Sequence, residues 1–236
     1  MDIADHIRLK TARLLLPKLY PVLRQQFPQA LWGGNPHLRQ VALTFDDGPH
    51  PGDTPQLLEV LARHQVSATF FFLGTRVEAY RQLVLQVAQA GHHIGSHGYF
   101  HRPFLFEPPE RLQQQLSVAQ ALIAQSAQRA LIEVRDLRPP YGLALPDVLQ
   151  RLIAWNYRPV MATILPLHWL QSEELSIAEV MSQVRPGSLI VLHEDKTGGP
   201  PVAQLTDHVL TRLKDAGFEL ITIDQMWQSL AGAEAE

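Results

Sequence analysis

Two short segments carry side chains whose types and spacing could perform chemistry. Residues 44–49 contain the adjacent carboxylates Asp46 and Asp47, directly after an apolar run. Residues 96–101, further along the chain, contain His97 and His101 at i, i+4 spacing. One carboxylate and two imidazoles are a sufficient ligand set for a catalytic divalent metal ion, with positions left open for water. The other carboxylate is then available as a base, so the pattern indicates metal-assisted hydrolysis.

Neither segment is specific when it is taken alone. Adjacent carboxylates in a loop are usually only solvated, and histidines four residues apart are often neighbours on a helix surface. Both segments, however, lie at the end of a strand-like run. Their combination is therefore much more specific than either part.

Composition narrows the class of protein. The 236 residues with 46% hydrophobic composition suffice for a large core, in one domain of barrel size or in two smaller ones. The 20 basic and 23 acidic residues give a net charge of −3, and this balance argues against a nucleic-acid partner. The chain has no cysteine, which excludes disulfides, thiolate metal sites and a cysteine nucleophile.

The N-terminal region lacks targeting signals that we recognise. Residues 1–10 do not have the basic-then-apolar pattern of a signal peptide, and no stretch approaches the ~20 apolar residues of a membrane span. We therefore expect a cytoplasmic protein. Residues 3–26 mix basic with apolar side chains, and one interpretation is a helix lying on a membrane surface. We favour the alternative of an amphipathic segment packed under the main domain.

The rest of the chain alternates between strand-like and helical patterns. A Gly- and Pro-containing segment at residues 32–36 separates an N-terminal helical extension, residues 1–38, from a main domain over residues 39–230 and a frayed tail over 231–236. We predict strands at residues 41–45, 68–73, 92–96, 134–138, 158–164, 189–192 and 219–223. Between them we predict helices starting at residue 54 and over residues 78–90, 110–128, 146–155, 177–184 and 202–215.

This alternation predicts an α/β fold with parallel strand pairing. Polar residues cluster at the C-terminal end of nearly every predicted strand. In an α/β barrel that rim converges on one site, whereas in an open sheet only the strands near the switch point converge. We therefore favour a seven-stranded barrel. Its rim would collect the following side chains: Asp46, Asp47, His97, His101, Arg138, Tyr141, Trp169 and His193.

Residues 40–228 resemble the NodB-homology polysaccharide deacetylases, carbohydrate esterase family 4. Residues 44–48 (TFDDG) resemble the first motif of that family, and residues 97–101 (HGYFH) resemble the second. Residues 138–142 (RPPYG) resemble the third, and residues 192–193 (LH) the fifth. The resemblance implies a distorted seven-stranded α/β barrel, which agrees with the strand count.

The resemblance also implies roles for individual residues. Asp47, His97 and His101 would hold one divalent ion, usually zinc in this family, although Co²⁺, Ni²⁺ and Mn²⁺ suit the same donors. Asp46 would be the general base. Arg138 would keep Asp46 ionised and oriented.

The remaining motifs imply the groups that receive the substrate. The backbone N–H of Tyr141, set by a proline turn, would stabilise the oxyanion. His193 would protonate the leaving amine. The expected substrate-binding residues are Trp169, Leu192 and Pro140.

The fourth motif departs from the family pattern. The family carries Asp-Trp here, whereas this chain carries His168 followed by Trp169. A histidine cannot supply the negative charge that favours a protonated His193. Either another carboxylate (Glu194, Asp195 or Glu173) partners His193, or the acid step is impaired. We expect an active enzyme with a re-tuned acid.

These observations predict a metal-dependent hydrolase of carbon–nitrogen bonds that removes N-acetyl groups from an amino sugar or oligosaccharide. One alternative is a hydrolase of a small non-sugar amide. Another is a metal-binding, carbohydrate-recognising pseudoenzyme, in which His168 in place of Asp has abolished the protonation of the leaving amine. The intact Asp46 argues against the pseudoenzyme, because a pure binder needs no base.

Overall fold

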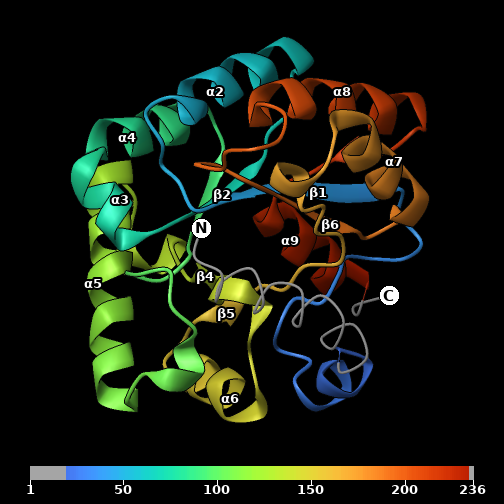
Figure 1. Cartoon of the computed structure of the whole chain (residues 1–236). Helices are drawn as coiled ribbons and strands as arrows, with labels where there is room; N and C mark the ends of the chain where they lie inside the picture. Colours follow the sequence, from blue (N-terminus) through green and yellow to red (C-terminus); the bar gives the residue numbers. More distant parts are fainter. Residues whose placement is uncertain (1–19, 234–236) are drawn as a thin grey trace.

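The computed structural model describes residues 20–233, in which strands and helices alternate (Figure 1). A strand lies at every predicted position, although β4, β5 and β7 are shorter than predicted. All pair in parallel in one seven-stranded sheet of order β5-β4-β3-β2-β1-β6, with β7 paired to β1. The strands are β1 (Gln40–Asp46), β2 (Thr69–Phe72), β3 (His93–Ser96), β4 (Asp136–Leu137), β5 (Arg158–Pro159), β6 (Leu189–His193) and β7 (Glu219–Leu220).

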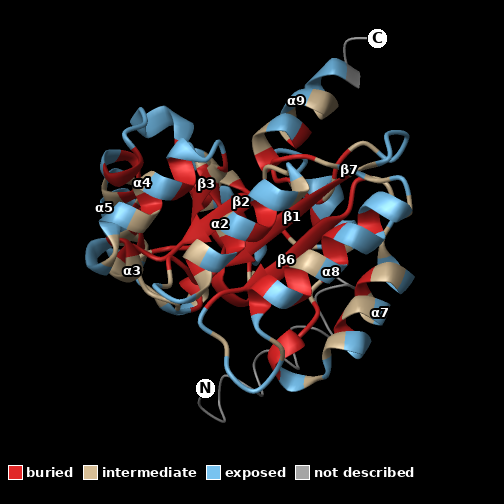
Figure 2. Cartoon of the chain, turned by 90° about the horizontal axis from the view of Figure 1, so that it is seen from above, coloured by how far each residue is buried: buried red, intermediate tan, exposed pale blue. Residues whose placement is uncertain are grey.

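Most helices cover the outside of this curved sheet. They are α2 (Asp53–His64), α3 (Gly74–Ala79), α4 (Arg81–Gln89), α5 (Pro109–Ala127), α6 (Pro146–Ala154), α7 (Glu173–Gln183) and α8 (Val202–Asp215). Helix α9 (Ile223–Ala233) instead packs on the inner face, where Ile223 and Met226 share a core cluster with Ala42 and Phe71. Buried residues run along the strands and the inward sides of the helices (Figure 2). The main core joins β1 and β2 to α2 and α8, for example through Phe45, Phe70, Leu61 and Leu210. Burial of these apolar side chains supplies the main driving force for folding.

The helices differ from prediction in three places. The predicted helix over residues 78–90 is broken at Tyr80 (φ −135°), which separates α3 from α4. Helix α7 begins earlier than expected, because the Ser172 hydroxyl accepts a hydrogen bond from the Leu175 N–H and caps the helix. Helix α9 was not predicted, although Thr222 and Gln225 form the reciprocal hydrogen bonds of a capping box at its start.

A segment before β1 fills the gap between the two edge strands, β5 and β6. The Leu31 N–H donates to the Pro159 carbonyl (2.8 Å), and the Met161 N–H donates to the Leu31 carbonyl (2.9 Å). On the other side, the Gly34 N–H donates to the carbonyl of Gly187 (2.8 Å). We call the pairing of residues 30–34 with the chain on both sides the seam. Gly187 has φ +82°, and a Cβ there would lie 2.6 Å from the Gly34 carbonyl oxygen, so this position of the seam requires glycine. Within the described residues the sheet is thus a half-barrel completed by residues 30–34 and by a bridge between Ile164 and Ile190 of β6.

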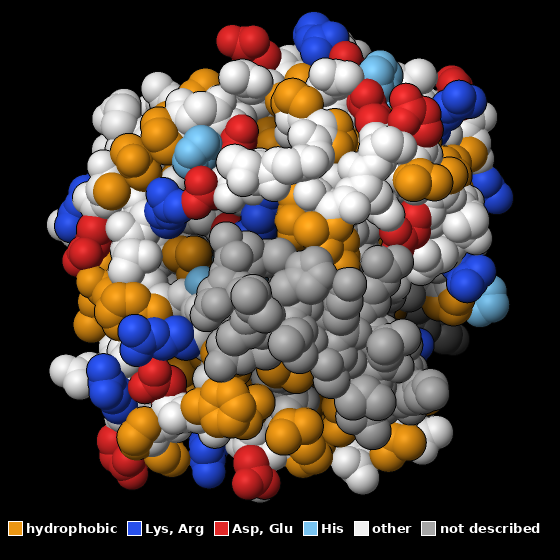
Figure 3. All heavy atoms as spheres, in the orientation of Figure 1, with side chains coloured by type: hydrophobic (Ala, Val, Ile, Leu, Met, Phe, Trp, Pro, Cys, Tyr) orange, Lys and Arg blue, Asp and Glu red, His pale blue; other side chains and the backbone are white. Residues whose placement is uncertain are grey.

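The segment over residues 3–26, which we predict to be amphipathic and packed under the main domain, lies mostly outside the described residues. Its described part, residues 20–26, is helical, and Leu23 packs against the barrel with Trp32 and Met161. No helix in the described part of the chain is long and apolar enough to cross a membrane. Basic and acidic side chains are interspersed over the visible face of the molecule (Figure 3).

Candidate active site

The end of β1 directs two adjacent carboxylates towards different partners. Asp46 is the last residue of the strand, whereas Asp47 adopts a left-handed conformation with φ 73°. Such a conformation is uncommon for a residue with a side chain and is often found at functional sites. Both carboxylates are nearly fully buried at the rim of the barrel. Buried carboxylates require charged or hydrogen-bonding partners, and each has them here.

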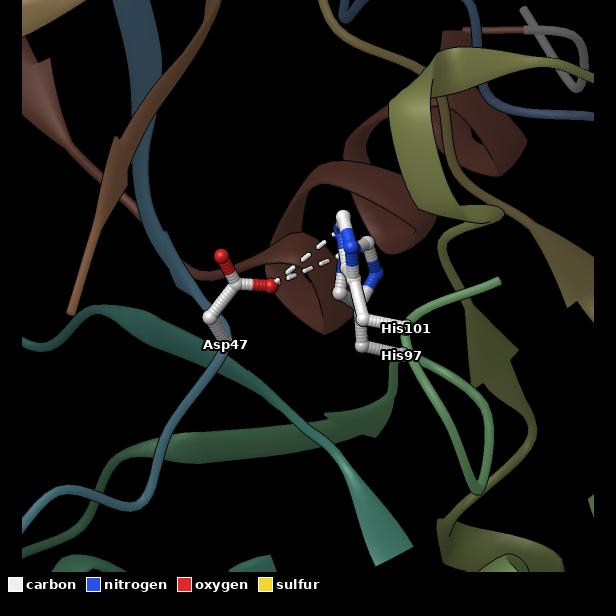
Figure 4. A group of neighbouring side chains, drawn as sticks. All are labelled: Asp47, His97 and His101. Atoms are coloured by element: carbon white, nitrogen blue, oxygen red, sulfur yellow. Dashed lines mark ion pairs between the residues drawn. The ribbon is translucent and has the colours of Figure 1, made fainter. Parts of the chain in front are cut away.

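Asp47 faces two histidines that follow β3. Its Oδ1 lies 3.5 Å from Nε2 of His97 and 3.4 Å from Nε2 of His101. The three side chains converge on one point (Figure 4), with one ligand atom from each lying within 4.8 Å of the others. The structure therefore brings together the three residues expected to hold a metal ion.

The tautomer of His97 suits metal binding. Its Nδ1 lies 2.7 Å from the backbone carbonyl of Arg138. Because a carbonyl can only accept, Nδ1 carries the proton, and Nε2 presents its lone pair towards Asp47. Metal-ligating histidines are commonly oriented in this way.

The donor set also fits a tetrahedral ion in geometry and charge. Bonds of about 2.1 Å at tetrahedral angles place two ligand atoms about 3.4 Å apart, close to both Asp47–histidine distances. Oδ1 of Asp47 is buried and has no hydrogen-bond partner among the described residues. Burial alone would raise the pKa of Asp47, but the charges of His101 and Lys196 hold it well below its usual value. Burial lowers the pKa of His101, and the neighbouring carboxylate of Asp47 opposes that shift.

Asp46 is held by Arg138. Nη1 of Arg138 donates to Oδ1 of Asp46 (2.7 Å) and to the hydroxyl of Thr44 (2.6 Å), while Nη2 donates to the Met161 carbonyl (3.2 Å). The guanidinium also lies 4.2 Å from the ring centroid of Phe71. These contacts fix the cation beside Asp46. The other oxygen of Asp46 lies 3.8 Å from Nε2 of His97, beside the candidate metal position.

Tyr141 follows two prolines and has a left-handed backbone, with φ 62°. Its ring lies 4.5 Å from the ring of His101, so this turn forms a wall of the site. Fixed proline torsions before it stiffen the turn. The backbone N–H of Tyr141 thus belongs to a rigid segment at the edge of the metal position.

A cavity of ≈ 200 Å³ joins these groups. The expected substrate-binding residue Trp169 lines it, but Leu192 and Pro140 do not; their neighbours Val191 and Pro139 do. Leu192 is fully buried in the main core instead. Contrary to expectation, Leu192 therefore does not line the cavity. Side chains alternate between the two faces of β6, so that Val191 and His193 point to the cavity and Leu192 points to the other face.

His193 lies in the cavity without a charged partner on its ring. Its Nδ1 is buried and has no hydrogen-bond partner among the described residues. His168 is close, but its Nε2 accepts from the backbone N–H of His193 (3.3 Å) rather than from the ring. Burial lowers the pKa of His193 well below its usual value and lowers that of His168 to about 4. Both rings are therefore neutral at pH 7.

The three carboxylates considered as alternative partners of His193 lie elsewhere. Glu194 accepts a hydrogen bond from Thr54. Asp195 pairs with Arg76, and Glu173 pairs with His208 (2.6 Å). Within the described part of the chain, none of them hydrogen-bonds to His193, so the expected re-partnering is not found.

Lys196 and Tyr20 are among the cavity residues that were not predicted. Nζ of Lys196 lies 2.5 Å from Oδ2 of Asp47, and Tyr20 lines the cavity from the segment that precedes β1. The only signal for Lys196 was its position three residues after His193 at a strand end. No local pattern indicated Tyr20, because the packing of its ring on Trp32 (5.1 Å between centroids) depends on the tertiary fold.

Comparison with known proteins identifies relatives of this fold and site. A family model described as polysaccharide deacetylase matches residues 33–160. The chain is 35% identical to the chitooligosaccharide deacetylase of Rhizobium leguminosarum bv. trifolii, over 79% of this chain and 91% of the relative.

Solved structures agree with the sequence relatives. A peptidoglycan N-acetylglucosamine deacetylase superposes with a TM-score of 0.79 and 29% identity, over 85% of this chain and 94% of the other. PdaA of Bacillus subtilis, a family 4 carbohydrate esterase, superposes with a TM-score of 0.78 and 26% identity, over 88% of each chain. The resemblance inferred from the sequence motifs and the barrel-like α/β fold are both confirmed.

Proposed function

Because the chain belongs to the polysaccharide deacetylase family, we propose that it is a divalent-metal-dependent N-deacetylase of an N-acetylated amino sugar or its oligosaccharide. Its relatives include chitooligosaccharide and peptidoglycan N-acetylglucosamine deacetylases. The observation that carries the proposal is the convergence of Asp47, His97 and His101 on one point, with Asp46 beside them in the same cavity.

Asp47, His97 and His101 are the proposed metal ligands, and zinc is the proposed ion. Two imidazoles and a carboxylate suit Zn²⁺, and Co²⁺, Ni²⁺ or Mn²⁺ could replace it. When bound, such an ion polarises the acyl oxygen and lowers the pKa of water at the site. The remaining chemistry falls to the side chains of the cavity.

Asp46 is the proposed general base, accepting the proton of the attacking water. A carboxylate performs this role when it is ionised and within reach of the proton. The ion pair with Arg138 (2.7 Å) supports this role, because it restricts the carboxylate to one orientation beside the candidate metal position. Arg138 itself acts through Asp46 as a positioning residue.

The proposed substrate pose follows from the walls of the cavity. The backbone N–H of Tyr141 would donate to the oxyanion as the acyl carbon becomes tetrahedral. The indole of Trp169 would lie against the sugar ring, since aromatic faces suit the apolar side of a ring. A volume of ≈ 200 Å³ accommodates the acetamido group and part of one ring, rather than a whole drug-sized ligand.

His193 is the proposed donor of the proton to the leaving amine. Its ring contacts Trp169, with 4.9 Å between centroids, and lines the cavity. However, the missing partner at Nδ1 and the lowered pKa make its protonated form scarce at pH 7. This observation favours a second candidate function, a sugar-binding protein with a metal site and a deficient acid.

Acetate release from N-acetylglucosamine oligomers tests the proposal. Metal-stripped protein would be reconstituted separately with Zn²⁺, Co²⁺, Ni²⁺ and Mn²⁺. Metal-dependent release is expected, and Asp46→Asn should lower it by about 10²- to 10⁴-fold while leaving metal binding intact. Tight metal binding and sugar binding without acetate release would instead support the second candidate, and activity only on a small amide would reassign the substrate.

A further inference from the structure

Lys196 occupies a position beside the candidate metal site to which the steps above assign no role. Its ammonium lies 2.5 Å from Oδ2 of Asp47 and 5.4 Å from the ring centroid of Trp169. The side chain is 23% exposed and lines the cavity. Lys196 therefore combines an ion pair, a contact with an aromatic face and access to the site.

The two oxygens of Asp47 face different groups. Oδ1 faces His97 (3.5 Å) and His101 (3.4 Å), whereas Oδ2 faces Lys196. A carboxylate with one oxygen held by a lysine presents the other oxygen alone to an ion. The arrangement thus selects a single coordinating oxygen, and hydrogen bonds to a ligating carboxylate typically tune a metal centre in this way.

The loop that carries Lys196 is itself held in place. Asp195 has a left-handed backbone (φ 57°) and pairs with Arg76, and its N–H donates to Asp53 (2.8 Å). Further along, a Cβ on Gly199 would clash with the carbonyl oxygen of His168, so the loop packs closely there. The position of Lys196 is therefore built by contacts on both sides of it.

The cations of the cavity divide between the two carboxylates. Among the described lining residues, the Lys and Arg side chains are Arg138 and Lys196. Arg138 pairs with Asp46, so Lys196 is the fixed cation beside Asp47. A divalent ion at Asp47 would share that carboxylate with a positive charge, and like charges so close repel each other strongly in a buried site.

We propose that Lys196 is a positioning residue of the metal site that leaves Asp47 only one oxygen for coordination. Before the metal binds, Lys196 neutralises the carboxylate of Asp47. Once a metal ion is present, the positive charge of Lys196 weakens the affinity of the site for that ion. This inference rests on the proposed metal-dependent function. Repulsion outweighs the orienting effect, because burial and the left-handed backbone already restrain Asp47. A moderate affinity would let the metal exchange instead of remaining trapped.

Calorimetric titration of metal-free protein with Zn²⁺ tests the inference. Lys196→Met should bind Zn²⁺ more tightly than wild type, by about tenfold or more, because the substitution removes a positive charge that repels the ion at close range. Lys196→Arg, which keeps the charge, should stay close to wild type. The metal-free Lys196→Met protein should also melt at a lower temperature than wild type, because Asp47 is then left buried without its cation.

The outcomes separate this inference from the proposed function. If wild type binds Zn²⁺ and releases acetate, but Lys196→Met binds Zn²⁺ equally or more weakly, the role of Lys196 is overturned and the function stands. If wild type binds none of the four ions, both are overturned. A lower affinity in Lys196→Met together with a normal affinity in Lys196→Arg would show that orientation, and not repulsion, dominates, which contradicts the proposal.

Discussion

At the scale of single residues, both carboxylates of the site have charged or polar partners. Asp46 has Arg138, and Asp47 has Lys196 on one oxygen and two histidines on the other. His193 differs, because its buried Nδ1 has no hydrogen-bond partner among the described residues. These contacts therefore support the proposed base and metal ligands more strongly than they support the proposed acid.

Replacing Arg138 should affect both stability and activity. Arg138→Met removes the cation and leaves Asp46 buried without a partner, a change that typically costs about 3–5 kcal/mol of unfolding free energy. Urea unfolding would measure this loss, and acetate release should fall with it. Arg138→Lys keeps the charge but cannot make all the contacts of a planar guanidinium, so it should recover only part of the stability. Full recovery in the lysine variant would contradict the role of the guanidinium geometry.

Position 168 should tune the acid. A carboxylate in His168→Asp would favour the protonated form of His193 and raise its pKa. The acid form is lost as pH rises through that pKa, so the alkaline limb of the pH–rate profile should move to higher pH. Each unit of increase multiplies the protonated fraction above the pKa by about ten. His168→Asn is the uncharged control, and an alkaline limb that stays in place in His168→Asp would refute the interpretation.

Glu194 should make stability depend on pH. It is fully buried, with one oxygen accepting from Thr54 and the other unpartnered, and burial raises its pKa to about 8. Because the pKa of Glu194 is higher in the folded than in the unfolded protein, the stability that protonated Glu194 contributes is complete below about pH 4.5. This stability is lost as pH rises towards 8. Glu194→Gln should therefore gain about 2–4 kcal/mol relative to wild type at pH 8, and little at pH 4.5.

Urea unfolding of Glu194→Gln and wild type at pH 4.5, 6 and 8 would measure this difference. Asp215→Asn, on the last turn of α8, provides a carboxylate-to-amide control outside the site. A Glu194→Gln effect independent of pH would contradict a buried, protonated Glu194.

At the scale of elements, the segment before β1 connects the edge of the half-barrel to Arg138 and Asp46. Leu31 exchanges backbone hydrogen bonds with Pro159 and Met161, and the Met161 carbonyl accepts from Arg138. Met161 and Arg138 thus link Leu31 to Asp46 through a chain of contacts. The N-terminal segment therefore helps to position Asp46, the proposed base.

Truncation of Leu31 tests this connection. Leu31 is 1% exposed, and Leu31→Ala should cost about 2–5 kcal/mol of unfolding free energy. Acetate release by the folded variant should also fall, because the seam holding Met161 would loosen. Leu38→Ala, at a site 40% exposed, is the matched control and should change stability by less than about 0.5 kcal/mol. Equal effects of the two substitutions would refute a structural role for the seam.

At the scale of the whole molecule, metal binding should stabilise the fold, because the three proposed ligands come from the residue directly after β1 and from the loop after β3. Their convergence requires the folded sheet, so the ion binds the folded state preferentially. Zn²⁺ at a hundred times its dissociation constant should add about 2.7 kcal/mol. For a chain of this size, that corresponds to a rise in melting temperature of about 5–10 °C.

Thermal unfolding with Zn²⁺ and with a chelator would measure this rise. Asp47→Asn keeps the shape of the side chain but removes the ligand charge, so it should show a much smaller shift. An equal shift in Asp47→Asn would place the ion elsewhere on the molecule.

The sequence by itself determined the strands and the rim residues. Apolar runs marked the seven strands, and parallel strands place their carboxyl ends at one edge, so Asp46, His97 and Arg138 had to lie near one another once the strands were assigned. The short motifs then indicated the family, which the comparisons confirm. Even the missed helix α9 carried a local signal in Thr222 and Gln225.

Only the tertiary structure decided which partners the rim residues have. Lys196 reaches Asp47, and Glu194 turns away to Thr54, because loop torsions such as the left-handed Asp195 set the direction of each side chain. Such directions depend on contacts between segments far apart in the chain, and no local propensity encodes them. For the same reason, the sequence could not indicate that Nδ1 of His193 lacks a hydrogen-bond partner among the described residues.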